Sequence, residues 1–423
     1  HHTAPRAERR GRPVSLHPAL PDTLYLWHLG QPAAPRVVGT LNLVMNRRGV
    51  SLRYADAWLE DGFALSEDLP LTDVEHFPHD KDSAAGAVDD ARPDRWGERV
   101  IRLLDRPPRL SVLDYLYYAG DDRFGALGVS PRADAYQPHE IGPLPRLGDL
   151  QAVHEVVRRV LAREAVDERQ KRLLAPGVTM GGARPKALFE LEGAEWVIKF
   201  GEDDRPAEPL IEHATMTLAA RAGIQVAETR PIVLGRDVAV AIRRFDRAAG
   251  RRLHALSAKV ALRAAGVELS YPDLALLLRR RGKTATHRQQ MHELFRRLVF
   301  NILIDNTDDH EKNHVLLVGP EQHYTLAPAF DILPCAQSLG YQAMEVGERG
   351  AESSIDNALS ACAQYWLSPQ AARDEARRVA EVIEGWRAHF VAQGVGEADL
   401  DELGRHIDRP FLREQRQALQ GRW

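Results

Sequence analysis

The clearest hydrophobic pattern in this chain lies just before residue 305. Apolar side chains recur there at intervals of three and four residues, which places them on one face and predicts a buried helix. The residues are Met291, Leu294, Phe295, Leu298, Val299, Ile302 and Leu303. A dense polar run, 306–313, follows directly. A core helix is therefore expected to lead into a polar loop.

The residues after this loop predict a β-hairpin. Apolar residues 315–318 are followed by the turn signal Gly319-Pro320 and by a second short strand at 324–326. Asp331 stands just past the returning strand. Because a hairpin brings its two ends together, Asp331 is expected to lie beside the polar loop.

The rest of the pattern predicts an α+β protein. Short β-rich segments near the N-terminus favour a small antiparallel sheet, and the chain turns mainly helical past residue 246. The expected strands are 24–27, 37–41, 50–54, 187–191, 196–200 and 238–242. The expected helices include 93–101, 113–116, 150–161, 210–222 and a long stretch between Ser368 and Gly394. The Pro-rich segment 137–145 is typical of a linker and sets a domain boundary.

Composition narrows the class of protein. With 423 residues, 44% hydrophobic and 27% charged, the chain is an ordinary globular protein of two or three domains. Its net charge of -4 gives no global basic field for nucleic acid or an anionic membrane. Cys335 and Cys362 form no CxxC pair, which fits a reducing cytoplasm. We expect no membrane span and no signal peptide, and a cytoplasmic location.

The polar loop and Asp331 carry the side chains that phosphoryl transfer needs. Asp308 and Asn313 stand in the pattern Asp-x-x-x-x-Asn, and Asp331 follows after the hairpin. One carboxylate can orient the attacking hydroxyl while two oxygen ligands hold magnesium, as in protein kinases. Asp, Asn and His also crowd ordinary turns, where they cap backbone groups, so a solvated turn stays open as the alternative.

Further candidates lie between residues 179 and 199. The glycines of segment 179–186 would let backbone N–H groups approach phosphate oxygens, although a Gly-Gly pair is more often a simple turn. Lys199 lies inside an apolar strand, where its ammonium group needs a partner, and Glu208 and Glu212 on or near the next helix are candidates. The alternative is that Lys199 faces solvent from an edge strand.

The strand 238–242 ends in the polar segment 243–247, where the β-rich part gives way to the helical part. Backbone groups in such a segment can read an adenine, whereas Phe245 by itself could be plain core. A compact basic cluster, 279–283, is most simply a solvated surface, with contact to a phosphate backbone as the alternative.

Together these motifs resemble the HipA-type toxin serine/threonine kinases of bacterial type II toxin–antitoxin systems. The segments that carry the resemblance are 182–186, 196–200, 244–247 and 307–313 completed by 328–332, with 38–41 and 52–58 in the N-terminal third. The resemblance implies a two-lobed protein-kinase-like domain after an N-terminal accessory domain. The expected parts are a polar tail at 1–20, the accessory domain at 21–145, an N-lobe with the Gly-rich loop at 146–245 and a helical C-lobe with the catalytic loop at 246–423.

By position, the resemblance implies a role for individual residues. Asp308 would be the catalytic base, and Asn313 and Asp331 would be the Mg²⁺ ligands. The expected ATP contacts are Thr179, Gly181, Gly182, Ala183, Lys186, Lys199, Arg243, Arg244, Phe245, Asp246, His310, Lys312, Asn313 and Asp331. Thr179 departs from the family, which has a Ser there whose phosphorylation disables the kinase. Arg243 also departs, because an acidic residue often opens that motif.

The resemblance also implies partners. They are a translation component such as an aminoacyl-tRNA synthetase as phosphorylated target, a HipB-like helix-turn-helix antitoxin, and DNA only through that antitoxin. Three rival interpretations stay open. They are a small-molecule or lipid kinase, a catalytically silent corepressor, and a metal hydrolase that uses Asp305, Asp308, Asp309 and His310.

Overall fold

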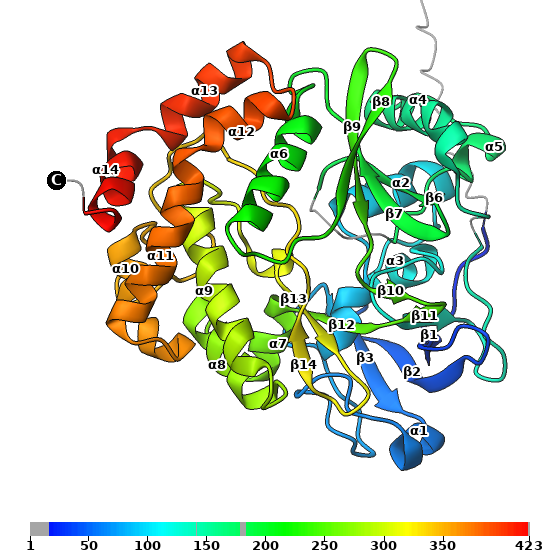
Figure 1. Cartoon of the computed structure of the whole chain (residues 1–423). Coiled ribbons are helices and arrows are strands. Elements are labelled where there is room, and N and C mark those ends of the chain that lie inside the picture. Colours follow the sequence, from blue (N-terminus) through cyan, green and yellow to red (C-terminus); the bar gives the residue numbers. More distant parts are fainter. Residues whose placement is uncertain (1–16, 141, 178–182, 422–423) are drawn as a thin grey trace, which may run out of the picture.

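The computed structural model describes residues 17–140, 142–177 and 183–421, and their arrangement is α+β (Figure 1). The N-terminal part holds a five-stranded sheet in the order β4-β3-β2-β1-β5, with β3 and β4 parallel and the other neighbours antiparallel. Its strands are β1 (Thr23–His28), β2 (Arg36–Val44), β3 (Gly49–Tyr54), β4 (Ser83–Ala84) and β5 (Leu127–Ser130). Its helices are α1 (Asp56–Asp61), the 3-10 helix η1 (Gly86–Ala91), α2 (Arg95–Val100), the π-helix η2 (Ile101–Asp105) and α3 (Val112–Tyr118).

A second sheet follows, four-stranded and antiparallel in the order β6-β7-β9-β8. Side chains alternate along its strands, so Leu188 and Val197 join one core while Phe189 and Trp196 join another. Helix α6 packs into the first core and α4 into the second. The elements are the 3-10 turn η3 (Leu147–Asp149), α4 (Leu150–Leu161), α5 (Glu168–Lys171), β6 (Lys186–Leu191), β7 (Ala194–Lys199), α6 (Glu208–Arg221), β8 (Thr229–Leu234) and β9 (Asp237–Arg243).

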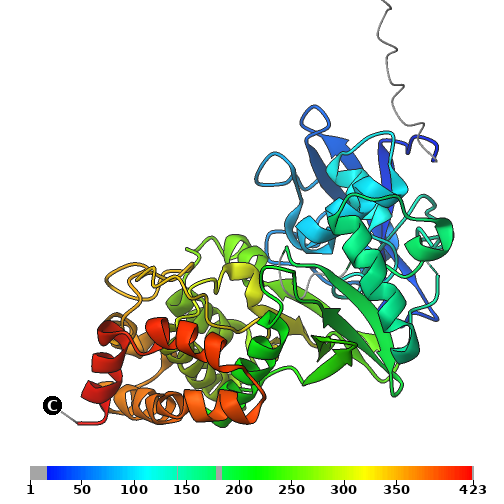
Figure 2. The same cartoon turned by 90° about the horizontal axis from the view of Figure 1, so that it is seen from above.

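The last part is mainly helical, and Figure 2 shows it on one side of the molecule with both larger sheets on the other. Its helices are α7 (Ala258–Ala264), α8 (Tyr271–Arg281), α9 (His287–Leu303), α10 (Ile355–Ser360), α11 (Pro369–Glu384), α12 (Trp386–Ala392), α13 (Glu397–Ile407) and α14 (Pro410–Leu419), with 3-10 turns η4 (Glu311–Asn313) and η5 (Cys362–Tyr365). A three-stranded sheet joins β12 (His254–Ser257), β13 (Val315–Val318) and β14 (Tyr324–Leu326), and β10 (Arg247–Ala248) pairs with β11 (Arg251–Arg252).

The predicted α+β class is confirmed, and so are the hairpin 315–326 and the buried helix before the polar loop. Two details differ. The helical stretch between Ser368 and Gly394 is interrupted at Gly385, where α11 ends and α12 begins. Besides the predicted hairpin, the chain past Asp246 forms β10, β11 and β12, and β12 adds to the edge of the hairpin through a pairing distant in sequence. The domain limits given above stay predictions.

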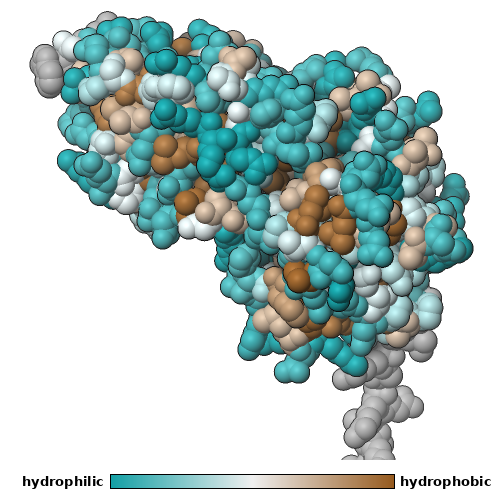
Figure 3. Space-filling view, turned by 90° about the horizontal axis from the view of Figure 1, so that it is seen from below, coloured by the Kyte–Doolittle hydropathy of each residue, from teal (hydrophilic) through white to brown (hydrophobic). Residues whose placement is uncertain are grey.

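In the face shown in Figure 3, brown side chains form separate patches among hydrophilic ones. Among the described residues, no helix combines the length and apolarity that a membrane crossing requires. Cys335 and Cys362 are both free thiols.

Candidate functional site

Helix α9 ends at the polar loop, as its apolar periodicity requires. Beneath the loop, Asp309 is buried and accepts hydrogen bonds from the Tyr271 hydroxyl and from Gln342 Nε2 at 2.8 Å. Asp308 instead points outward and is exposed. The Asn313 amide nitrogen donates to the Asp308 carbonyl at 3.0 Å, which leaves the amide oxygen as the ligand atom that Asn313 can offer. The loop is thus fixed from below and presents Asp308.

Asp331 lies at the far end of the β13–β14 hairpin, in a left-handed backbone conformation with φ 56°. The buried Lys199 ammonium lies 2.7 Å from Glu212 Oε1 and 3.2 Å from Asp331 Oδ1. Burial alone would raise the pKa of Asp331, but Lys199 and Arg184 outweigh it and lower that pKa to about 2. Burial alone would lower the pKa of Lys199. The charges of Asp331 and Glu212 outweigh that effect, so the pKa of Lys199 is raised above its ordinary value. Lys199 therefore faces inward, not toward solvent from an edge strand.

One cleft brings the polar loop and Asp331 together. Its volume is about 690 Å³, within the usual range for a small-molecule site. Residues from three parts of the chain line it: Asp89, Asp90, Arg92, Pro93, Asp94, Arg95, Glu98, Phe124, Ala183, Arg184, Ser257, Asp308, His310, Glu311, Lys312, Asn313, Val315, Phe330 and Asp331. Burial and the Asp331 charge raise the pKa of Asp308, while His310 opposes that shift. The oxygen donors present fit a hard divalent cation.

Of the other residues predicted to contact ATP, some line the cleft and others do not. Ala183, His310 and Lys312 line the cleft with Asn313 and Asp331. Lys186 is buried opposite Lys199 on the neighbouring strand, and its ammonium group lies 2.5 Å from Asp94 Oδ2. Thr179, Gly181 and Gly182 lie outside the described residues.

In the segment at the end of β9, too, only some of the predicted residues lie near the cleft. Phe245 is half-buried, with its ring 5.4 Å from that of Phe330 in the cleft wall. Arg243 is exposed and reaches Glu228 at 3.7 Å. The Arg244 guanidinium and the Asp246 carboxylate are buried and bind each other at 2.9 Å, away from the cleft lining. The nucleotide contacts expected of this segment stay predictions. Asp246 also has a structural role, because its buried carboxylate binds the Arg244 guanidinium.

The N-terminal part supplies cleft residues that the sequence did not single out. Asp94 caps helix α2 by accepting a hydrogen bond from Gly97 N at 2.8 Å, and Trp96 of the same helix donates to the Lys186 carbonyl at 2.9 Å. Helix α2 is therefore fastened to strand β6. A cap signal at Asp94 is visible in the sequence, but its partner Lys186 is distant in sequence and could not be inferred from it.

Asp90 fastens the same N-terminal segment to the end of strand β12, because it accepts hydrogen bonds from Ser257 N and Ser257 Oγ, both at 2.7 Å. Burial raises the pKa of Asp90 to about 6, against the opposing effect of these bonds. A carboxyl whose pKa is higher in the folded state favours folding most below its unfolded pKa of 3.8, and loses that contribution as the pH rises through about 6.

We therefore expect Asp90→Asn to remove one pH-dependent loss of stability. Between pH 4 and pH 7, the thermal midpoint of the wild type should decrease relative to that of the variant, as measured by circular dichroism. Asp61→Asn, at a side chain that is 90% exposed, is the control and should show no such trend. Parallel curves for Asp90→Asn and wild type would contradict the assignment.

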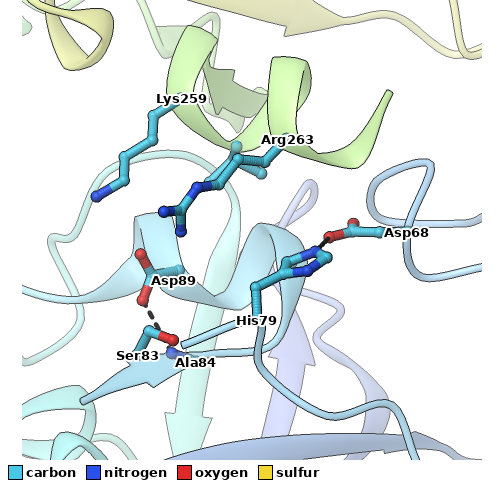
Figure 4. A pocket seen from close by; sticks show the side chains of 9 residues that line it. Asp68, His79, Ser83, Ala84, Asp89, Lys259 and Arg263 are labelled. Atoms are coloured by element: carbon cyan, nitrogen blue, oxygen red, sulfur yellow. Dashed lines mark hydrogen bonds and ion pairs between the residues drawn. The ribbon is translucent and has the colours of Figure 1, made fainter. Parts of the chain in front are cut away.

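A smaller pocket lies where α7 faces the N-terminal part (Figure 4). Lys259 and Arg263 extend from α7 toward Asp89, and His79 binds Asp68 at 2.9 Å. The volume of about 20 Å³ is room for about one water molecule. This pocket is accordingly a packed seam between the two parts and not a second ligand site.

Two alternatives from the sequence can be placed on the structure. Asp305 pairs with Arg409 at 3.0 Å and Asp309 with Tyr271, so the acidic residues of the loop face different ways. Across residues 17–140, 142–177 and 183–421, no three His, Cys, Asp or Glu side chains converge as a metal site would require. The metal-hydrolase interpretation therefore finds no support.

The basic cluster 279–283 is largely engaged within the chain. The Arg280 guanidinium lies 2.7 Å from Glu67, Arg279 lies over Trp366 and Arg281 over Tyr324. These contacts fit the interpretation as structured surface.

The cleft that the polar loop and Asp331 line together is the arrangement that a kinase-like protein requires. The HipA N-terminal domain matches residues 33–130, and the HipA-like C-terminal domain matches residues 178–389. The chain therefore belongs to the HipA-type toxin family.

Individual proteins resemble this chain at low sequence identity. The chain is 26% identical over 235 residues to Y4dM of Sinorhizobium fredii, covering 48% of this chain and 53% of that protein, and 24% identical over 182 residues to a Haemophilus influenzae protein, covering 37% and 52%. Both are provisionally named kinases, and the chain spans about half the length of each. HipA in the Shewanella oneidensis complex of HipA, HipB and operator DNA has the same fold, with a TM-score of 0.66 at 18% identity over 94% of this chain and 97% of that one.

Proposed function

We propose that this protein is a Mg-ATP-dependent serine/threonine kinase that acts as the toxin of a toxin–antitoxin module. The observation that carries the proposal is the shared cleft, in which Asp308, Asn313 and Asp331 line one cavity of nucleotide size. Family membership and the provisional kinase names of two relatives support the same reaction class.

The side chains of the cleft divide the work of phosphoryl transfer. Asp308 accepts a hydrogen bond from the attacking hydroxyl and takes its proton. Asn313 and Asp331 would hold Mg²⁺ through their side-chain oxygens, and the bound ion would supply positive charge for the phosphate groups of ATP. Lys199, held by Glu212, contributes a fixed positive charge beside Asp331.

The target and partner follow from resemblance. We propose a translation component, such as an aminoacyl-tRNA synthetase, as the phosphorylated protein. The Shewanella oneidensis structure contains HipB and operator DNA with HipA, which supports a HipB-like antitoxin as partner and DNA contact through that antitoxin.

The deciding experiment compares wild type with Asp308→Asn. Each protein is incubated with Mg-ATP and bacterial lysate, and phosphosites are mapped by mass spectrometry. We expect labelling of Thr179 or of one foreign protein to fall by about 10²-fold to 10³-fold in the variant, because general-base catalysis contributes about that much. The Kd for Mg-ATP should stay nearly unchanged. Equal labelling by both proteins would contradict the proposal, and label confined to lipid or small molecules would redirect it.

A further inference from the structure

A second pocket, of about 290 Å³, also reaches the polar loop. It shares Arg184, Asp308 and Asp331 with the cleft. The rest of its wall comes from Asn306 and Thr307 of the polar loop, from Arg205 and Glu208 at the start of α6, and from segment 333–339. The two cavities therefore meet at two carboxylates and one guanidinium. The atoms that transfer a phosphoryl group would lie at this junction.

The two pockets are chemically different. Asn313, His310 and Lys312 line the cleft and are absent from the lining of the second pocket. Asn313 and Asp331 can therefore both reach a metal ion only from the cleft, where a metal-bound nucleotide would lie. The second pocket remains for the group that receives the phosphoryl.

One wall of the second pocket has an unusual backbone. Ala336, Ser338 and Gly340 have φ values of 52°, 51° and 78°, so left-handed residues alternate along the segment. For residues other than glycine this conformation is strained and persists only where the surroundings impose it. Such a segment is held in shape before any substrate arrives.

Asp305 provides that hold. Its carbonyl accepts a hydrogen bond from Cys335 N at 2.9 Å, its carboxylate accepts one from Ser338 N at 3.3 Å, and Arg409 binds the same carboxylate at 3.0 Å. Asp305 is buried and stands at the start of the polar loop. Asp305 therefore holds the wall of the second pocket from a position directly before the loop that carries Asp308.

The outer part of this wall is apolar. Leu333 is buried, whereas Leu339 is 42% exposed although it lines a pocket that contains Asp308. Tyr341, two residues on, is also exposed. Leu339 therefore offers an apolar contact to a molecule bound in the pocket that Asp308 also lines.

We propose that the second pocket is the acceptor site, and that it takes an extended protein segment with a serine or threonine at Asp308 and an apolar side chain against Leu339. This inference rests on the proposed kinase function. The acceptor oxygen forms a bond to the γ-phosphorus as the bond to the ADP oxygen breaks, and Asp308 takes the hydroxyl proton. Arg184, held 2.8 Å from Glu208, lies at the junction to meet the charge of the transferring group.

The test uses the full chain with Mg-ATP and a library of peptides, each with one central serine and randomised flanking positions. We expect a preference of about tenfold for apolar residues at one position within two residues of the serine, since one buried apolar contact contributes about 1–3 kcal/mol. Leu339→Asp should abolish that preference and raise the acceptor KM, without changing the Kd for Mg-ATP. The control is Leu276→Asp on α8, which is 39% exposed and lines neither pocket.

If peptides are poor acceptors, the same selection is scored on the sequences around the Asp308-dependent phosphosites of lysate proteins. Phosphosites without an apolar neighbour, or an unchanged selection in Leu339→Asp, would overturn the acceptor-site assignment. Label on lipids or small molecules with none on proteins would overturn it too. Failure of the kinase proposal has a separate signature, the absence of any Asp308-dependent transfer from ATP.

Discussion

Replacement of Asp331 by asparagine is expected to lower phosphoryl transfer by about 10⁴-fold, because the negative charge of a proposed metal ligand is lost. Asparagine keeps the shape of the side chain and tolerates the left-handed backbone of residue 331, so the hairpin should fold as before. The variant also removes one of the two carboxylates that hold Lys199. We expect both the Mg²⁺-dependent affinity for ATP and the rate to fall.

Isothermal titration of ATP with and without Mg²⁺ measures the first effect, and phosphosite labelling measures the second. Glu321→Gln serves as a charge-matched control, because that carboxylate is 82% exposed on the turn of the same hairpin. It should leave ATP binding and rate as in wild type. Mg²⁺-dependent binding that survives unchanged in Asp331→Asn would contradict a role for the Asp331 charge in metal binding. Loss of that binding would separate the role of Asp331 from that of Asp308, whose replacement should spare binding.

The geometry around the polar loop could be predicted because its causes are local. An apolar stripe fixes helix α9, a Gly-Pro turn fixes the hairpin, and the hairpin returns Asp331 to the cleft that Asp308 lines. Each step depends on residues close together in sequence. The roles assigned to Asp308, Asn313 and Asp331 stay predictions, although their common cleft is what those roles need.

The contribution of the N-terminal part could not be predicted in this way. Asp94 reaches Lys186 and Asp90 reaches Ser257 across separations of 92 and 167 residues. No periodicity in one segment specifies a partner so far away. The position of Arg184 could not be predicted either. Only the structure shows that its side chain lines both pockets where they meet.

The segment after β9 shows how one motif can serve the fold as well as a site. Arg244 donates to the carbonyls of Asp122 and Arg123, both at 2.9 Å, and Asp246 accepts from Gly125 N at 2.8 Å. These bonds join the N-terminal part to the passage between the lobes. Burial opposes charge on Asp246, but Arg244 and Arg247 outweigh it and hold its pKa well below the ordinary value. An ion pair buried this deeply, with its other polar atoms also engaged, is costly to break.

We therefore expect Arg244→Met to lower the free energy of unfolding by about 3–5 kcal/mol, since Asp246 would keep a buried charge with fewer partners and two carbonyls would lose their donor. Urea denaturation followed by circular dichroism and tryptophan fluorescence measures the loss. Arg243→Met is the adjacent control: its guanidinium is 55% exposed and reaches only Glu228 at 3.7 Å among the ion pairs of the described residues, so its cost should stay within about 0.5 kcal/mol. If the two variants unfold at the same urea concentration, the Arg244–Asp246 pair does not hold the N-terminal part in place, and the walls that Asp90 and Asp94 give to the cleft must be fixed by other contacts.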